Sequence, residues 1–165
     1  MPQLLAAPHR LCSHLQNVSR GAVARTAIPY SESSLAITSI LLRHGLISTL
    51  TLGSRTEPIP SIFPSLDVAE RRIWIGMKYR SGLPVLRHMN VVSKGSFRVI
   101  LDNAELGRIL TGRRAKNVAG ISMGEILVVR TPANAKIGRK GRDTIMDGWE
   151  AWRAGLGGEL MVRVA

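Results

Sequence analysis

The fold is decided by the stretch Arg153-Ala-Gly-Leu-Gly-Gly-Glu-Leu-Met-Val-Arg-Val-Ala165, in which a glycine-rich turn joins a helical pattern to a short alternating strand. Gly155 can end the helix in the left-handed backbone conformation that residues with a Cβ avoid. Gly157 and Gly158 let a backbone pass close to another group. The stretch therefore predicts a small α+β module whose closing turn is either structural or touches a large ligand.

A helix over 144–154 is predicted before this turn, because Ile145, Trp149 and Trp152 follow the i, i+4, i+7 spacing of one helix face. Since they share that stripe, the two tryptophans are expected in the core rather than stacked on bases. A nucleotide-binding enzyme would need a helix after the glycine turn, with its N-terminus pointing at a phosphate. The residues after Gly158 alternate as in a strand, so a dinucleotide site is excluded.

The charge of the chain is concentrated in one half. The 165 residues carry a formal net charge of +12, and residues 71–142 hold 16 Lys and Arg against three acids, a net of +13. The remaining residues sum to −1, from seven basic and eight acidic side chains. Thirteen uncompensated cations would repel one another, so a phosphate-rich partner is favoured over a merely solubilising surface. An aromatic content of 4% argues against a surface for stacking single-stranded RNA.

Other classes of protein find little support. A single cysteine, Cys12, excludes a disulfide framework and a zinc site built on paired cysteines, and the four histidines show no metal-ligand spacing. The scattered acids and histidines do not form the grouping that a nucleic-acid-modifying enzyme needs. No apolar run is long enough to span a membrane, and most of the charge lies outside any amphipathic helix. We therefore expect no enzymatic activity, no cofactor, no metal and no membrane partner.

The first 31 residues contain Arg10, Arg20 and Arg25 and no acid. Arginine without acid on a potentially amphipathic helix is typical of a mitochondrial targeting segment. Eleven acids in 165 positions would place about two in such a window, so chance remains the weaker alternative.

The first half of the chain predicts an α-β-α-β-β unit, assigned to a domain of residues 1–80. Helices are expected over 9–19 and 35–43, the second capped by Ser33 or Ser34 and ended by Gly45. Strands are expected over 23–28, 46–52 and 73–79. Three prolines make 53–70 an irregular surface excursion.

A turn at 81–84 begins a second domain of residues 81–165. Strands over 85–92, 97–101, 125–131 and 160–164, with the single helix over 144–154, predict a mainly antiparallel β domain. The loops 111–118 and 132–142 are basic and contain glycine, which favours contact with phosphate.

Four collinear segments resemble small-subunit ribosomal protein eight, the bacterial-type family that also occurs in mitochondria and plastids. The residues 154–159 followed by a strand resemble that family's ending, and 29–47 resembles its second-helix segment. Lys78-Tyr79 and Val92-Ser93-Lys94 with Arg98 resemble its middle segment. The resemblance runs from about Leu11 to Ala165, with insertions at 53–70, 111–118 and 132–142.

This resemblance implies a two-domain protein without a catalytic role. Such a protein binds the central domain of small-subunit rRNA, lies beside neighbouring small-subunit proteins, is monomeric within the ribosome, and supports subunit assembly and translation. Together with the acid-free first segment, it implies the small subunit of the mitochondrial ribosome, in the matrix. A plastid or bacterial origin and a free-standing basic RNA-binding regulatory protein are the alternatives.

The resemblance also assigns residues to RNA. It places Asn17, Ser31 and Ser33 at RNA in the first domain, and Thr131 alone survives from a Ser-Thr-Ser-x-Gly loop in the second. Arg130 replaces a short hydroxyl there with a long cation, and Pro132 removes a backbone donor. For the glycines a structural role is about as strongly expected as RNA contact. The candidate RNA-binding residues are Asn17, Arg20, Ser31, Ser33, Lys94, Arg98, Arg113, Arg114, Lys116, Arg130, Thr131, Lys136, Gly155, Gly157, Gly158 and Glu159.

Overall fold

A computed structural model describes residues 7–133 and 141–165. The chain divides into two compact units, Met1–Met89 and Asn90–Ala165. The sequence placed a boundary after residue 80, which lies within a hairpin of the first unit.

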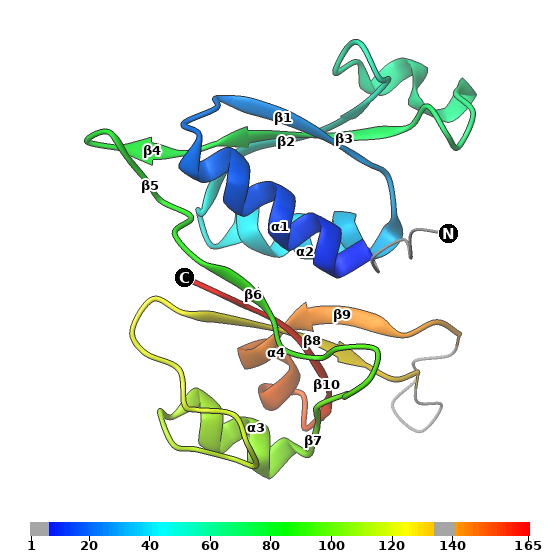
Figure 1. Ribbon diagram of the computed structural model, residues 1–165. Helices are drawn as coiled ribbons and strands as arrows, with labels where there is room; N and C mark the ends of the chain where they lie inside the picture. Colours follow the sequence, from blue (N-terminus) through cyan, green and yellow to red (C-terminus); the bar gives the residue numbers. More distant parts are fainter. Residues whose placement is uncertain (1–6, 134–140) are drawn as a thin grey trace. The chain divides into compact units, whose positions relative to one another are not determined.

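Unit 1 packs two helices on one face of a three-stranded antiparallel sheet (Figure 1). Its strands lie in the order β1-β3-β2, and apolar side chains of the helices and of β3 are buried together, among them Leu15, Ile37 and Ile73. Its elements in chain order are α1 (Ala7–Arg20), β1 (Arg25–Pro29), α2 (Glu32–Arg43), β2 (Ile47–Gly53), the 3-10 helix η1 (Pro60–Ser65), β3 (Arg72–Met77), β4 (Tyr79–Arg80) and β5 (Leu83–Pro84).

The predicted elements of unit 1 are present, with shifted ends. Gly45 ends α2 with a φ of +73°, as its position predicted. The predicted capping residue is wrong: Ser31, not Ser33 or Ser34, is the N-cap of α2, and its hydroxyl accepts a hydrogen bond from the Ser34 N–H at 3.0 Å. The helix therefore begins three residues earlier than its apolar pattern suggested, because its first turn is polar.

Unit 2 is built on a five-stranded sheet with two helices. The strand order is β6-β10-β8-β9, and β7 also pairs with β10, so that β10 lies inside the sheet. The elements are β6 (Met89–Val91), β7 (Ile100–Leu101), α3 (Asn103–Leu110), β8 (Ile126–Thr131), β9 (Thr144–Asp147), α4 (Gly148–Arg153) and β10 (Gly158–Val164).

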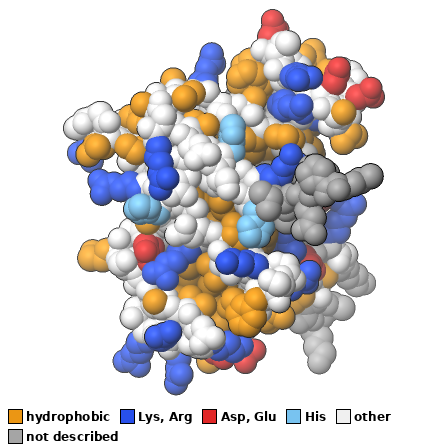
Figure 2. Space-filling view, in the orientation of Figure 1, with side chains coloured by type: hydrophobic (Ala, Val, Ile, Leu, Met, Phe, Trp, Pro, Cys, Tyr) orange, Lys and Arg blue, Asp and Glu red, His pale blue; other side chains and the backbone are white. Residues whose placement is uncertain are grey.

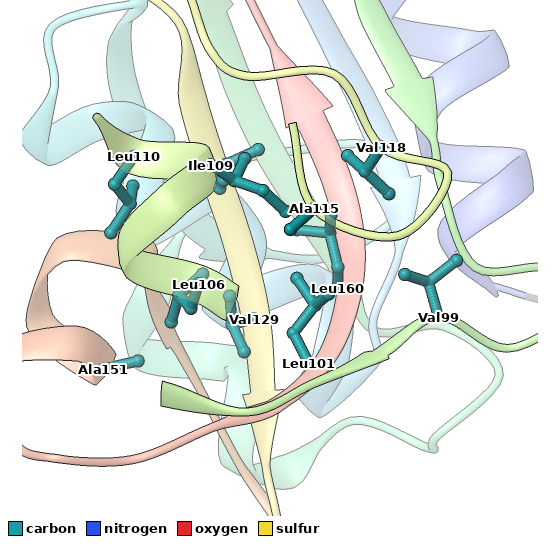
Figure 3. Packing of buried hydrophobic residues seen from close by; sticks show 11 residues of the cluster. Val99, Leu101, Leu106, Ile109, Leu110, Ala115, Val118, Val129, Ala151 and Leu160 are labelled. Carbon is teal, nitrogen blue, oxygen red and sulfur yellow. The ribbon is translucent and has the colours of Figure 1, made fainter. Parts of the chain in front are cut away.

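The core of unit 2 joins both helices to the sheet. Leu106 and Ile109 of α3, Ala151 of α4, Val129 of β8 and Leu160 of β10 are all buried in one cluster (Figure 3). The core thus fixes the position of the turn between α4 and β10 relative to β7 and β8.

The prediction of a single helix in this half is wrong, because α3 is a second one. The apolar residues of α3 recur at i, i+3 and i+4, and the Glu105 carboxylate accepts a hydrogen bond from the Asp102 N–H at 3.0 Å, as in a capping box. The Asp-x-x-Glu spacing was a readable signal for this helix.

The helix predicted over 144–154 is also wrong in its first part. Residues 144–147 form β9 and pair with β8, so Ile145 does not share a helix face with the tryptophans. Trp149 packs against the core, but Trp152 is 39% exposed, with the two rings edge to face at 5.8 Å. The predicted strands over 85–92 and 97–101 shrink to three and two residues, and Phe97 is exposed.

The loop 111–118 is not a free basic insertion. Ala115 and Val118 pair with each other through backbone hydrogen bonds, and both side chains are buried in the core of unit 2. Its other side chains, the basic ones among them, are exposed, so the loop is partly a core element.

Candidate nucleic-acid interface

A cleft of about 550 Å³ in unit 1 lies between α1, β1 and the start of α2. On the α1 side it is lined by Arg10, Ser13, His14 and Asn17, which share one helix face because they lie three, four and seven residues apart. Leu15 is fully buried in the core, and Leu11, which is also buried, adds an apolar side chain to the lining of the cleft. The amphipathic pattern of α1 therefore fixes which polar side chains line the cleft.

The other wall of this cleft is the connection from β1 to α2. Ser31 lines it, and the Ser31 hydroxyl both caps the helix and donates to the Ser34 hydroxyl at 2.8 Å. The His14 ring nitrogen lies 2.6 Å from the Thr26 hydroxyl. An arginine, an amide and several hydroxyls are groups that bind phosphates and ribose hydroxyls.

The cleft gathers Asn17 and Ser31 of the predicted residues and leaves two others outside it. Arg20 is exposed at the end of α1, and Ser33 is half-buried in the first turn of α2. The sequence argument missed Arg10, although it lies seven residues before Asn17 on the same face.

A second cleft, of about 480 Å³, lies in unit 2 where β7, β8 and β10 meet the turn after α4. Two cations, Arg98 and Arg130, line it together with the closing turn. Six predicted residues that are distant in sequence are brought together here: Arg98, Arg130, Gly155, Gly157, Gly158 and Glu159. The sequence argument missed Asp102, Asn103 and Asp143, which also line it.

The ion pair between Arg130 and Glu159 sets the electrostatics of this cleft. The two residues are direct cross-strand neighbours on β8 and β10, and the shortest distance between their charged atoms is 3.8 Å. Both side chains remain partly exposed, at 31% and 19%. The cleft therefore offers donors from two arginines and, beside them, the carboxylates of Glu159, Asp102 and Asp143, which only accept hydrogen bonds.

The three glycines of the turn have distinct structural functions. Gly155 has a φ of +71° and follows the C-cap of α4, as predicted. A Cβ on Gly157 would lie closer than 3.0 Å to the Leu101 carbonyl oxygen, and one on Gly158 equally close to the Arg130 carbonyl oxygen. Each of the adjacent glycines is therefore required by a different strand of the protein itself. RNA contact is therefore not needed to explain either of them.

The remaining predicted residues lie outside this cleft. Lys94, Arg113 and Arg114 are exposed, whereas Thr131 is fully buried and its hydroxyl donates to the Thr144 carbonyl at 3.1 Å. Lys116 donates to the Ile100 carbonyl at 2.6 Å and pairs with Glu105 at 3.0 Å, so it is engaged within unit 2. Lys136 lies outside the described residues.

Two carboxylates in unit 2 have lowered pKa values, for different balances of causes. The pKa of Glu105 lies below its usual range, mainly because its carboxylate accepts a hydrogen bond from the backbone N–H of Asp102. The hydrogen bond from Lys116 lowers the pKa of Glu105 further. Burial raises the pKa of Glu125, but hydrogen bonds from Ser122 and Arg163 outweigh burial and lower it overall. Arg163 also donates to the carbonyls of Ala119 and Gly120, each at 2.9 Å. Both carboxylates are therefore structural anchors of unit 2.

The described ranges 7–133 and 141–165 contain no group of three His, Cys, Asp or Glu side chains arranged to hold a metal ion. None of the helices within those ranges is both long and apolar enough to cross a bilayer. Cys12 is buried, and burial raises its thiol pKa to about 12.

Comparison with known proteins finds relatives of this chain among the proteins of the small ribosomal subunit. No family model matches the sequence. The chain is 36% identical over 129 residues to the small ribosomal subunit protein uS8m of Neurospora crassa, covering 73% of this chain and 80% of the relative. It is 33% identical over 158 residues to uS8m of Schizosaccharomyces pombe, covering 94% and 97%. The bacterial protein uS8 of Laribacter hongkongensis is 25% identical over 156 residues. These similarities confirm the resemblance found in the sequence, and the chain belongs to the uS8 family of small ribosomal subunit proteins.

Proposed function

We propose that this chain is a structural constituent of the small subunit of the mitochondrial ribosome, in the matrix, where it binds the central domain of small-subunit rRNA. The observation that carries the rRNA contact is the cleft of unit 2, where Arg98 and Arg130 flank the closing glycine turn. The names of the two fungal relatives, small ribosomal subunit protein uS8m, support the mitochondrial assignment.

The chemistry of the cleft suits folded RNA rather than a small anion. In an RNA helix the phosphates and ribose hydroxyls are accessible, whereas the deep groove excludes side chains. Arg98 and Arg130 supply cations for phosphates. Glu159, Asp102 and Asp143 would repel a phosphate but accept hydrogen bonds, so they suit ribose hydroxyls or exocyclic amines. This combination favours a distorted or bulged RNA segment, in which both kinds of group are exposed.

Unit 1 would make a second contact with the same RNA. Its cleft offers one arginine, Arg10, beside Asn17 and the Ser31 turn at the start of a 12-residue helix. The partial positive charge at a helix N-terminus favours a neighbouring phosphate. Exposed Arg113 and Arg114 add charge at a third place on the protein, so we expect binding to depend strongly on salt.

Two measurements test this function. In a fungal host, the tagged chain should sediment with the mitochondrial small subunit after matrix fractionation. Sedimentation at the top of the gradient with RNA bound would instead support a free-standing regulatory RNA binder. With purified protein, a transcript of the central rRNA domain should compete at least tenfold better than a transcript of another domain, and equal competition would refute the central-domain assignment.

The arginines can be tested without disturbing the fold. The double variant R113A/R114A should keep the melting temperature, because neither side chain belongs to the core, and should flatten the salt dependence of RNA binding. By analogy with duplex DNA, each lost phosphate contact should change the log–log slope by about 0.9. An unchanged slope would mean that these two arginines do not contact phosphate.

A further inference from the structure

The excursion between β2 and β3, residues 54–70, is built into unit 1 by specific contacts. The Trp74 indole N–H donates to the Ser54 carbonyl at 2.9 Å. The Phe63 ring lies edge to face against Tyr30, with centroids 5.1 Å apart. Arg72, in β3, donates to the Ala69 carbonyl at 2.7 Å. These contacts therefore hold residues 54–70 in a defined conformation against the remainder of unit 1.

The arginines beside the excursion are turned onto the protein itself. The Arg71 guanidinium lies over the Phe63 ring at 5.2 Å and donates to the Leu66 carbonyl at 3.1 Å. Arg72 is occupied by two carbonyl oxygens, those of Ala69 and Arg71. The Arg71 Nε and Arg72 Nη1 donors are thus used to fasten the excursion.

The carboxylates of the excursion, in contrast, are exposed to solvent. Glu57, Asp67 and Glu70 are exposed, and none forms an ion pair or side-chain hydrogen bond with a residue in the described part of the chain. With Arg55 as the one cation, residues 54–70 carry a net charge of −2 in a chain of net +12. Figure 2 shows acidic side chains gathered over this excursion, at its upper right.

Apolar side chains accompany these acids at the surface. Val68, next to Asp67, is 73% exposed, and Ile59 is 38% exposed. Association with another protein would remove these two apolar side chains from water. RNA offers phosphates and no cations, so it cannot complement the carboxylates of this surface.

We propose that residues 54–70 dock a neighbouring protein of the small subunit through a surface of that partner that is rich in Lys and Arg around exposed apolar side chains. Charge complementarity selects this partner: the carboxylates attract a basic protein and repel the phosphates that the remainder of the chain attracts. The excursion thus separates protein binding from RNA binding on one small chain. This inference rests on the proposed function.

Site-specific cross-linking tests the proposal in assembled subunits. The full-length chain carries a photoreactive benzophenone amino acid in place of Val68, and a matched chain carries it in place of Met123, which is fully exposed in unit 2. The small subunits are isolated, irradiated and analysed by mass spectrometry. We expect the probe at Val68 to give one predominant cross-link to a protein whose cross-linked segment is net basic, with less RNA than protein product, and the probe at Met123 not to give that protein cross-link.

Charge reversal gives a second readout. D67K/E70K should lower the yield of the protein cross-link at least fivefold, and D67N/E70Q should lower it less, while melting of the free chain stays unchanged for both. Cross-linking of Val68 mainly to RNA, to a second copy of this chain, or to nothing, in chains that do sediment with the small subunit, would overturn the docking proposal alone. Failure of the unmodified chain to sediment with the subunit would overturn the proposed function, and the docking proposal with it.

Discussion

Replacement of Gly157 by valine tests whether this glycine is needed for the fold of the chain or for the approach of RNA. In the structure a Cβ at this position would collide with the carbonyl oxygen of Leu101, a residue of β7 that is only 2% exposed. Leu101 cannot yield without leaving the core of unit 2, and the pairing of Gly158 with Leu101 would be disturbed as well.

The expected magnitude follows from this collision. Extra carbon atoms forced into a packed site destabilise by roughly 1–3 kcal/mol, and a backbone partner that cannot move places Gly157→Val near the upper end. For a cooperative chain of this size, roughly 2–4 °C of melting temperature corresponds to 1 kcal/mol. We therefore expect a loss of about 3 kcal/mol in the free energy of unfolding and a melting temperature lower by roughly 6–12 °C.

The assay is urea and thermal unfolding of the free full-length chain, followed by RNA binding at a temperature where the variant is folded. Gly95→Val is the matched control, because no atom lies within 4 Å of a Cβ there and its φ is not in the left-handed range. Its stability should change by less than about 0.5 kcal/mol. A Gly157→Val protein that melts like the wild type but no longer binds RNA would refute the structural explanation and show that RNA approaches this glycine.

Three further perturbations test other parts of the structure. Arg130→Ala should flatten the slope of log affinity against log salt by about 0.9 and change stability by less than about 1 kcal/mol, because its ion pair with Glu159 is partly exposed; filter binding between low and physiological salt and a thermal melt measure both. Ser31→Ala should lower stability by about 1 kcal/mol through loss of the α2 cap, whereas Ser33→Ala should change it by less than about 0.5 kcal/mol, so equal losses in urea unfolding would contradict the capping assignment. Glu125→Gln tests a pH dependence: because the pKa of Glu125 is lowered in the folded state, its contribution is present above the unfolded value of 4.5 and is lost as the pH falls through the folded pKa. The stability difference between wild type and this variant should therefore be largest near pH 7 and shrink below pH 4.5, and a difference that grows in acid would show the assigned direction to be wrong.

The parts of the fold that could be predicted are those set by local pattern. The helix ended by Gly45, the alternating strand β3 and the left-handed Gly155 are each written in a few neighbouring residues. The basic half of the chain was equally visible in the sequence. These signals required no knowledge of which segments meet.

The parts that failed depend on partners far away in the chain. Ile145 has the spacing of a helix face with Trp149, yet residues 144–147 pair with the edge of β8 and form the strand β9. Thr131 resembled an RNA-binding residue, yet β9 covers its hydroxyl. The need for glycine at 157 and 158 comes from Leu101 and Arg130, which no local pattern could reveal.

The candidate site was predicted in part, for the same reason. The arginines and the closing turn were selected from charge and motif, and the fold brings Arg98, Arg130 and Glu159 to one cleft. Two further acidic residues of that cleft, Asp102 and Asp143, carry no sequence signal that points to the cleft. They are brought there by the pairing of the strands.

The interior position of β10 has a consequence for synthesis of the chain. The sheet of unit 2 places β10 between β8 and both β6 and β7, so the sheet cannot form until residue 164 has emerged from the translating ribosome. Residues 132–164 require about 2–7 s at roughly 5–20 residues per second, and during that time the edge of β8 that pairs with β10 has no partner strand. Unit 1 can fold in the same interval, because all of its strands have already been made. A nascent chain stalled between residues 132 and 158 should therefore bind chaperones through β8 while its first unit already resists protease.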